Sequence, residues 1–247
     1  MKPYFRVIVP CYNCVAYLPK LLDSMLSQDF DEWKCVIVDD WSDDMTFELA
    51  QSYQRRFPDR FLVLRPNAKA YPGGCRNIGM RQDFGSEYDL FADADDYFYS
   101  KDAFSRIHEG IRENGDPDVL LLEYCHDKDG KLTKYEFPEF NKRAENLAQT
   151  SWTAAWTKAV KTSFDEPFLP DCARAEDAYH MLKLMDKDPK VAHLRGCVYV
   201  YRMHDGNVTK KQVFKDHIPR YIAALETLRK VCRLEWVRKS IDRRLGK

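Results

Sequence analysis

The sequence predicts an α/β fold in which a mostly parallel sheet is flanked by helices. Short apolar runs, typical of strands buried on both faces, alternate with segments whose apolar residues recur at helical spacing. Such alternation implies right-handed crossovers between parallel strands. Several predicted strands also end in polar or acidic residues, so one edge of the sheet should carry most of the polar chemistry.

Strand and helix patterns alternate along the first half of the chain. The run FRVIVP at 5–10 predicts a buried strand ended by proline, and KCVIVDD at 34–40 predicts a second strand that ends in two carboxylates. Further strands are predicted at 61–64 and 119–124, and another begins at Tyr88. Helices are predicted at 15–28, 45–56, 75–83 and 101–114, and a Pro/Gly loop at 65–75.

Patterns in the second half are more varied. Residues 126–150 predict a polar hairpin with an Asp-Gly turn at 129–130, followed by a connector. A helix is expected from Glu176 to about Met185, and a last strand at 198–201. One or two long amphipathic helices are predicted over 212–245, with an apolar stripe of Ile218, Ile222, Leu225, Leu228, Cys232, Trp236 and Ile241.

The composition is typical of a water-soluble globular domain. Hydrophobic residues make up 45% of the 247 positions, enough for a core, and charged residues make up 32%. No stretch approaches the roughly 18 consecutive apolar residues that a membrane-spanning helix needs. The N-terminus goes straight into a predicted strand and offers no signal peptide. We therefore expect a cytoplasmic location.

Charge is unevenly distributed, although the net charge is zero. From Val208 to Lys247 there are twelve Lys and Arg residues against four Asp and Glu residues, so this segment carries +8 and residues 1–207 carry −8. Three interpretations are open. The segment could pack on the body with a solvated basic face, attach to an anionic membrane at its inner face, or capture an anionic polymer such as nucleic acid.

Eight cysteines are spread along the chain. Cys11 and Cys14 form a single Cys-x-x-Cys pair, and no second pair stands at zinc-binding spacing. We therefore expect small apolar side chains in a reducing cytosol rather than a redox or zinc role.

Three carboxylates follow the apolar strand that begins at Tyr88. Asp93, Asp95 and Asp96 are close enough to repel and to raise one another's pKa, and a hard divalent cation is the usual relief. Such an ion often bridges a carboxylate to a substrate's phosphates, so an Asp-x-Asp after a strand indicates a metal–diphosphate site. Taken alone, the cluster is equally compatible with a solvated turn.

A series of motifs makes the chain resemble the family 2 glycosyltransferases of the GT-A fold. In order they are VIVPCYN at 7–13, VDDWSDD at 38–44, GCRNIG at 74–79, FADADD at 91–96, WTK at 156–158, ED at 176–177 and YRMH at 201–204. Trp41 departs from the pattern, because the family usually has glycine there. The resemblance implies a Rossmann-like GT-A domain with a nucleotide-sugar-binding half at 1–125 and an acceptor-binding half at 126–209. The charge and the helical pattern predict a basic helical extension at 210–247.

The resemblance also implies how a nucleotide-sugar donor is bound. Tyr12 would offer an aromatic face, and Asp40 a carboxylate acceptor, to uracil or a similar base. Arg76 could pair with an anionic oxygen of the donor, because its planar fork matches phosphate, or it could form an internal salt bridge. The implied donor-binding residues are Pro10, Tyr12, Asp40, Arg76, Asp93 and Arg202, with Asp93 at the ribose and Arg202 at a phosphate.

Metal ligands are implied by the same resemblance. Asp95 and His204 would hold Mn²⁺ or Mg²⁺ on the diphosphate of the donor. The residues alone do not decide which of Asp93, Asp95 and Asp96 bind the metal.

Catalytic and acceptor residues complete the implied site. Asp177 would be the general base, with Glu176 beside it, since a carboxylate is favoured at the start of a helix and can deprotonate an acceptor hydroxyl. Capping of the helix is the alternative role for this pair. Trp156 and Lys158 are expected on the acceptor side, with a core position as the alternative for Trp156.

The expected activity is metal-dependent transfer of a sugar from a nucleotide sugar, a UDP-sugar first of all, to an acceptor hydroxyl with inversion. A glycan, a cell-wall polymer or a lipid-linked saccharide would be the acceptor. Two alternatives are open: the same chemistry on a hydroxylated DNA base held by the basic segment, or a catalytically silent domain that binds sugar nucleotides or a glycan.

Overall fold

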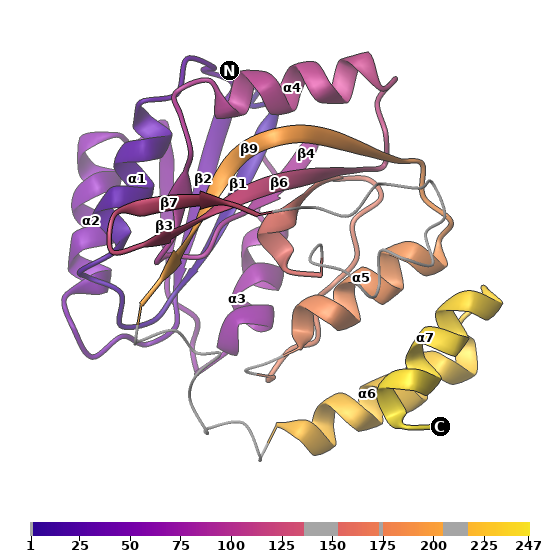
Figure 1. The fold of residues 1–247 in the computed structure, drawn as a ribbon. Coiled ribbons are helices and arrows are strands. Elements are labelled where there is room, and N and C mark those ends of the chain that lie inside the picture. Colours follow the sequence, from indigo (N-terminus) through magenta and orange to yellow (C-terminus); the bar gives the residue numbers. More distant parts are fainter. Residues whose placement is uncertain (1, 136–152, 173–174, 205–216) are drawn as a thin grey trace.

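The computed structural model of the chain describes residues 2–135, 153–172, 175–204 and 217–247. Among these residues, nine strands form one sheet in the order β3-β2-β1-β4-β8-β6-β9-β5, with β7 paired to β6. The sheet is curled and mostly parallel, and helices cover both of its faces (Figure 1). The predicted fold class is confirmed.

The first half of the sheet is parallel throughout. Its strands are β1 (Phe5–Cys11), β2 (Trp33–Asp39), β3 (Phe61–Leu64) and β4 (Tyr88–Phe91). Cys11 is in register with Asp39, and Ile8 is in register with Phe91. The residues that follow β1, β2 and β4 therefore leave the sheet at the same edge, which confirms the predicted convergence of polar strand ends.

The second half of the sheet mixes directions. It contains β5 (Tyr97–Phe98), β6 (Val119–Lys128), β7 (Lys131–Lys134), β8 (Lys158–Lys161) and β9 (Val191–Met203). β8 is antiparallel to both β4 and β6, whereas β9 is parallel to β6. β5 and β8 were not predicted, since each is too short to show a period. β9 is longer than the predicted 198–201, because Gly196, at a φ of 87°, interrupts the apolar pattern without ending the strand.

Two layers of helices enclose the sheet. On one face lie α1 (Leu18–Leu26), α2 (Thr46–Arg56) and α4 (Ala103–Glu113); on the other lie α3 (Tyr71–Met80) and α5 (Glu176–Asp186). Side chains of β1 alternate between the two cores: Val7 and Val9 pack with α1 and α4, and Ile8 packs with α5. A short 3₁₀ turn, η2 (Ala155–Thr157), leads into β8.

Helix α3 begins at Tyr71, so part of the predicted 65–75 loop is helical. Asp40, at the end of β2, accepts hydrogen bonds from the backbone N–H groups of Ala70 (2.7 Å) and Tyr71 (3.0 Å), which would otherwise be unpaired at the helix start. Gly73 allows a close approach, because a Cβ there would lie 2.2 Å from the carbonyl oxygen of Leu169. Gly73, one of the residues that suggested a loop, instead allows helix α3 to lie close to the backbone of Leu169.

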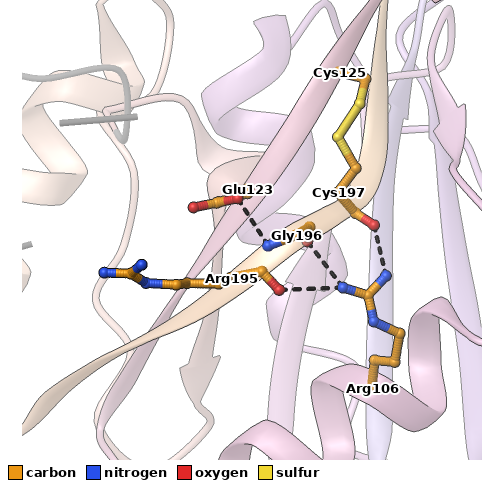
Figure 2. Close-up of a disulfide and its surroundings, with 6 residues drawn as sticks. All are labelled: Arg106, Glu123, Cys125, Arg195, Gly196 and Cys197. Carbon is orange, nitrogen blue, oxygen red and sulfur yellow. Dashed lines mark hydrogen bonds between the residues drawn. A yellow bond between two sulfur atoms is a disulfide. The ribbon is translucent and has the colours of Figure 1, made fainter. Parts of the chain in front are cut away.

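Two of the eight cysteines form a disulfide, which corrects the expectation of eight reduced side chains. Cys125 on β6 is bonded to Cys197 on β9, 72 residues away (Figure 2). The guanidinium of Arg106 donates to the backbone carbonyls of residues 195, 196 and 197 beside it. Spacing did not indicate the pair, because only the pairing of β6 with β9 brings the two residues together. The other six cysteines are buried thiols.

Residues 210–216 of the predicted C-terminal extension lie outside the described residues, and its described part, 217–247, contains two helices, α6 (Ile218–Val231) and α7 (Glu235–Leu245). Leu225, Leu228 and Ile241 are buried in one core cluster with the apolar side chains of α5, so the pair packs on the body. Ile218 and Ile222, at the start of the predicted stripe, are exposed. No helix in the described ranges is long and apolar enough to cross a membrane.

Candidate active site

A buried arginine lies at the polar edge of the sheet. Arg76, on α3, is 2% exposed, and its guanidinium contacts three carboxylates. Nη2 is 2.7 Å from Oδ1 of Asp93, and Nη1 is 2.8 Å from Oε1 of Glu176 and 3.1 Å from Oδ1 of Asp177. One side chain thus joins the end of β4 to the start of α5. These partners are internal, which was the alternative to a donor contact by Arg76.

Three carboxylates around one guanidinium leave an excess of negative charge. Burial raises the pKa of Glu176 to about 7, helped by the charge of Asp177 and opposed by that of Arg76. Burial also raises the pKa of Asp93 to about 6, again against the effect of Arg76. The Asp177 side chain is 25% exposed and that of Glu176 is 7% exposed. Of these two carboxylates at the start of α5, Asp177 is therefore the one that an acceptor could reach.

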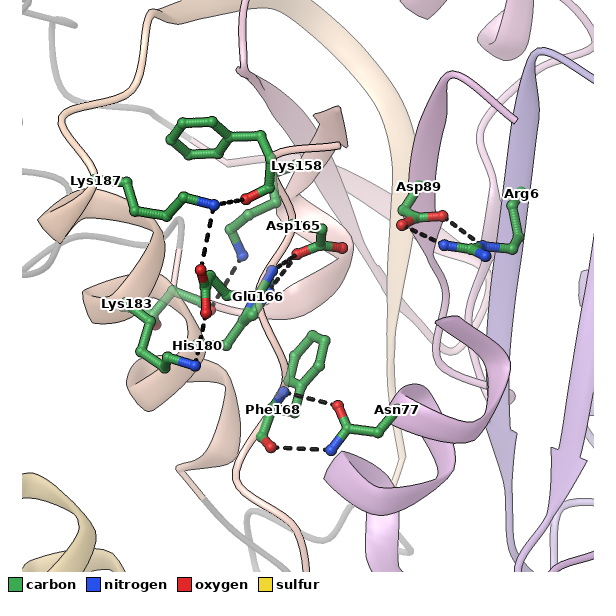
Figure 3. Close-up of polar contacts among 12 residues, drawn as sticks. Arg6, Asn77, Asp89, Lys158, Asp165, Glu166, Phe168, His180, Lys183 and Lys187 are labelled. Atoms are coloured by element: carbon green, nitrogen blue, oxygen red, sulfur yellow. Dashed lines mark hydrogen bonds and ion pairs between the residues drawn. The ribbon is translucent and has the colours of Figure 1, made fainter. Parts of the chain in front are cut away.

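Helix α3 contacts both the start of α5 and the segment that precedes it. Asn77 donates to the carbonyl oxygen of Phe168 (3.0 Å) and accepts from the Phe168 N–H (2.8 Å), as Figure 3 shows. A Cβ on Gly73 would lie 3.2 Å from Cβ of Glu176, so the two helices approach closely there. These contacts fix Asp177 relative to the sheet edge.

Asp95 and His204, the predicted metal ligands, lie together. Nε2 of His204 is 2.9 Å from Oδ2 of Asp95, and the ring of Tyr17 stacks on the imidazole with centroids 4.3 Å apart. The pair comes from the loop after β4 and from the residue after β9, 109 positions apart. Tyr17 was not predicted, because one tyrosine before a helix carries no signal.

The two side chains fit a divalent cation as part of its ligand set. Adjacent ligands of an octahedral ion with bonds of about 2.1 Å lie about 3 Å apart, and Asp95 Oδ2 and His204 Nε2 are 2.9 Å apart. In the described ranges, no group of three or more His, Cys, Asp or Glu side chains forms a metal site. The other ligands would have to come from a diphosphate and water, as is usual for Mg²⁺.

Asp96 is a buried residue beside the candidate metal ligands. It is fully buried, and its Oδ1 accepts from the backbone N–H of Arg202 at 2.8 Å. Burial and the charges of Asp95 and Asp93 raise the pKa of Asp96 well above its usual value. The hydroxyl of Tyr199, a residue not predicted for the site, accepts from the Asp93 N–H at 2.9 Å. Asp96 and Tyr199 tie β9 to the end of β4.

The predicted base-binding residues occupy the ends of β1 and β2. Tyr12 is 49% exposed, and the ammonium of Lys69 lies 3.0 Å from its ring centroid. Pro10 is partly buried within β1. The Asp40 carboxylate accepts a hydrogen bond from the backbone at the start of α3. The neighbouring Asp39 forms an ion pair with Arg65 at 2.7 Å. Base binding by these residues stays a prediction.

The predicted phosphate contact, Arg202, lies beside two tyrosines. Its guanidinium is 5.3 Å from the ring centroid of Tyr17 and 5.4 Å from that of Tyr97. The ring of Tyr17 also stacks on the imidazole of His204, so Arg202 lies on the same side of the site as the candidate metal ligands.

The two predicted acceptor-side residues are both buried. Trp156 is 7% exposed, stacks on Tyr199 with centroids 4.9 Å apart, and belongs to the core cluster that contains α1 and α4. This is the core position foreseen as its alternative. Lys158, on β8, has no exposed surface. An acceptor-side role for either residue stays a prediction.

A set of buried polar side chains that was not predicted lies around His180 of α5 (Figure 3). Nε2 of His180, on α5, is 2.7 Å from Oδ1 of Asp165. Nearby, Arg6 holds the buried Asp89 with contacts of 2.7 and 2.8 Å, and burial together with the charge of Asp165 raises the pKa of Asp89 to about 7. Burial keeps the pKa of His180 well below its usual value, so the imidazole is neutral. The members come from four separate segments, which is why no motif indicated them.

Comparison with known proteins identifies the family. Residues 6–156 match the family described as Glycosyl transferase family 2. The chain belongs to this family. The first five of the seven motifs, from 7–13 to 156–158, fall within or next to the matched residues, whereas those at 176–177 and 201–204 lie outside them. The family resemblance is confirmed.

Individual relatives of this family 2 glycosyltransferase support the fold. The poly(ribitol-phosphate) beta-N-acetylglucosaminyltransferase TarS of Staphylococcus aureus is 30% identical over 207 residues, which are 80% of this chain but 35% of TarS. The chain therefore spans about a third of that relative. The glycosyltransferase EpsJ of Bacillus subtilis, described as uncharacterized, is 25% identical over 241 residues, or 91% of this chain and 69% of EpsJ.

Solved structures have the same architecture. A crystal structure of S. aureus TarS residues 1–349 in complex with UDP-GlcNAc has a TM-score of 0.78 at 24% identity, covering 96% of this chain and 69% of that one. The mannosyltransferase PcManGT of Pyrobaculum calidifontis, solved with GDP-Man and Mn²⁺, has a TM-score of 0.63 at 15% identity, covering 100% of this chain and 75% of that one. The GT-A fold is thereby established.

Proposed function

We propose that this family 2 protein transfers a sugar from a UDP-sugar, UDP-GlcNAc first of all, to an acceptor hydroxyl with inversion. The observation that carries the proposal is the Arg76 bridge between Asp93 and Asp177. It joins the strand end expected to hold the donor to the carboxylate expected to act as base. Family membership and the fold shared with a TarS structure in complex with UDP-GlcNAc support a nucleotide-sugar donor.

In this mechanism Asp177 accepts the proton of the acceptor hydroxyl. The acceptor oxygen attacks the anomeric carbon from the face opposite the diphosphate, and the bond between that carbon and the diphosphate oxygen breaks. A single displacement of this kind inverts the anomeric carbon, releases the nucleoside diphosphate, and leaves the proton on Asp177 until it passes to solvent. Arg76 keeps the base in position throughout, because it also contacts Asp93 and Glu176.

The departing diphosphate gains charge as its bond breaks. Mn²⁺ or Mg²⁺, held by Asp95 and His204, would stabilise that charge as a Lewis acid. The Arg202 guanidinium, at the same corner, would contact a phosphate. Asp96 and Tyr199 support the site indirectly, because their hydrogen bonds hold β9 against the end of β4. The solved relative with Mn²⁺ and GDP-Man lends support to the metal.

A cell-wall polymer is the acceptor that we propose to test first. The relative TarS is named for poly(ribitol-phosphate), whose repeating units carry both hydroxyls and phosphates. Glycans and lipid-linked saccharides come next. The described residues offer no observation that favours a DNA base or an anionic membrane.

A thermal-shift screen tests donor and metal together. A ligand that binds only the native state raises Tm, so UDP-GlcNAc with Mn²⁺ should raise it more than UDP-GlcNAc with EDTA. Asp95→Asn should abolish this metal-dependent increment. Asp188→Asn, at an exposed position beyond α5, is the control and should leave the increment intact. If the increment survives in the Asp95 variant, the metal assignment is wrong.

A further inference from the structure

The imidazole of His204 lies just beyond the paired part of the sheet. β9 pairs with β6 up to Met203, and its pairing with β5 ends at Val200. Nε2 of the His204 ring is 2.9 Å from Oδ2 of Asp95. The face of the same ring stacks on Tyr17, with centroids 4.3 Å apart and planes at 27°. The imidazole thus has Tyr17 against its face and Asp95 at its Nε2 edge.

Tyr17 is itself held at the start of α1. Its N–H donates to the carbonyl oxygen of Cys14 at 2.9 Å, and the Cys14 N–H donates to Oγ1 of Thr46 at 2.9 Å. Leu18, the next residue, has no exposed surface and packs in the core. A side chain on a fixed backbone has few staggered rotamers, so the Tyr17 ring offers a fixed surface to its neighbours.

The Tyr17 ring also contacts Arg202, the predicted phosphate contact. The guanidinium is 5.3 Å from the ring centroid, within the distance at which an aromatic face attracts a cation. Arg202 has a second aromatic neighbour in Tyr97, at 5.4 Å. It would keep that contact if the Tyr17 ring were lost. Removal of the Tyr17 ring should therefore disturb His204 more than Arg202.

Orientation matters for a histidine ligand, because the lone pair of its nitrogen lies in the plane of the ring. A ring that turns about its side-chain bonds carries this lone pair away from the metal. Metal-binding histidines are usually oriented by neighbouring groups, and loss of such a group typically lowers metal affinity about 10- to 100-fold. Stacking on Tyr17 fixes the plane of the His204 ring while Nε2 faces Asp95.

We propose that Tyr17 is a positioning residue of the candidate metal site. Its ring holds the His204 imidazole in the plane in which Nε2 and the Asp95 carboxylate can bind one divalent cation. This inference rests on the proposed function, which assigns Mn²⁺ or Mg²⁺ to these two ligands. Tyr17 acts through His204 and does not itself bind the metal.

Calorimetric titration of the whole chain with UDP tests this role without turnover. UDP would be titrated once with Mn²⁺ and once with EDTA, and the ratio of the two Kd values gives the gain in UDP affinity due to the metal. Tyr17→Ala should reduce this gain about 10-fold or more. Tyr17→Phe keeps the ring and should keep the gain. Tyr99→Ala, at an exposed tyrosine just after β5, is the matched control and should also keep it.

Uridine is the probe that separates metal positioning from damage to the loop after β1. It contains the base and the ribose but no phosphate, and that loop carries Tyr12, which is predicted to bind the base. Uridine affinity should be unchanged in Tyr17→Ala. Equal losses of uridine affinity and UDP affinity would show that the variant deforms the loop, and would overturn the proposal.

Tyr17→Leu keeps the test valid if the alanine variant does not fold. Leucine fills much of the same space but has no flat face to stack on the imidazole, so the gain due to the metal should fall here as well. A gain that Tyr17→Leu retains in full would overturn this inference alone. A wild type that binds UDP equally well with Mn²⁺ and with EDTA would count against the proposed metal, and would overturn the role of Tyr17 with it.

Discussion

Nη1 of Arg76 lies 3.1 Å from Oδ1 of Asp177, although 101 residues separate the two in sequence. The same guanidinium is 2.7 Å from Asp93, so the end of β4 and the start of α5 are joined through one buried cation. A displacement reaction requires its base and its leaving group to be held in fixed relation. In the proposed mechanism, this ion-pair cluster would meet that requirement.

Removal of the base should stop chemistry and spare donor binding. Asp177→Asn should lower kcat for sugar transfer about 10²- to 10⁴-fold, the usual contribution of a general base. The rise in Tm caused by UDP-GlcNAc with Mn²⁺ should persist, because the predicted donor contacts lie elsewhere. Asp188→Asn serves as the control. A variant that transfers sugar at the wild-type rate would exclude Asp177 as base.

Glu176 should make the protein less stable as pH rises. Its pKa is raised in the folded state from 4.5 to about 7, so the folded state holds a proton that the unfolded chain has already lost between these values. The stabilisation is full below about pH 4.5 and is lost as pH rises through 7. Glu176→Gln should therefore raise Tm more at pH 8 than at pH 5, measured in metal-free buffer. An equal change at both pH values would show that Glu176 titrates normally.

Gly73 should tolerate no side chain. A Cβ at this position would meet the Leu169 carbonyl at 2.2 Å, whereas a Cβ on Gly74 would meet only the Cβ of Ala70, at 3.1 Å. Gly73→Ala should cost about 1–3 kcal/mol of unfolding free energy, the usual price of overpacking. Gly74→Ala, on the next residue of the same helix, should cost much less. Denaturant unfolding of both variants checks this, and equal losses would contradict the close contact.

The cysteine pairing can be counted chemically. Alkylation under denaturing, non-reducing conditions should modify six cysteines, and prior reduction should expose all eight. Intact-mass spectrometry gives both numbers. Reduction should also lower the unfolding free energy by about 2–4 kcal/mol, because the link constrains the unfolded chain. Eight alkylated cysteines without reductant would restore the original expectation of reduced side chains.

Patterns in the sequence predicted the framework of the site better than its contacts. The ends of β1, β2 and β4 were placed at one edge, because strand periodicity and parallel pairing are local and regular properties. The meeting of Asp95 with His204 was inferred from family resemblance, since 109 residues separate them. The Asp165–His180 pair and the Cys125–Cys197 bond escaped prediction, because each depends on how distant segments pack.

Turnover of a nucleotide sugar is the decisive test of glycosyl transfer by this protein. UDP release and sugar transfer would be measured with UDP-GlcNAc and other UDP- and GDP-sugars, with Mn²⁺ or EDTA, and with poly(ribitol phosphate), glycan or water as acceptor. We expect UDP release from a UDP-sugar that requires the metal and is lost in D177N. Binding of UDP-GlcNAc without turnover of any donor would contradict it and would indicate a catalytically silent domain.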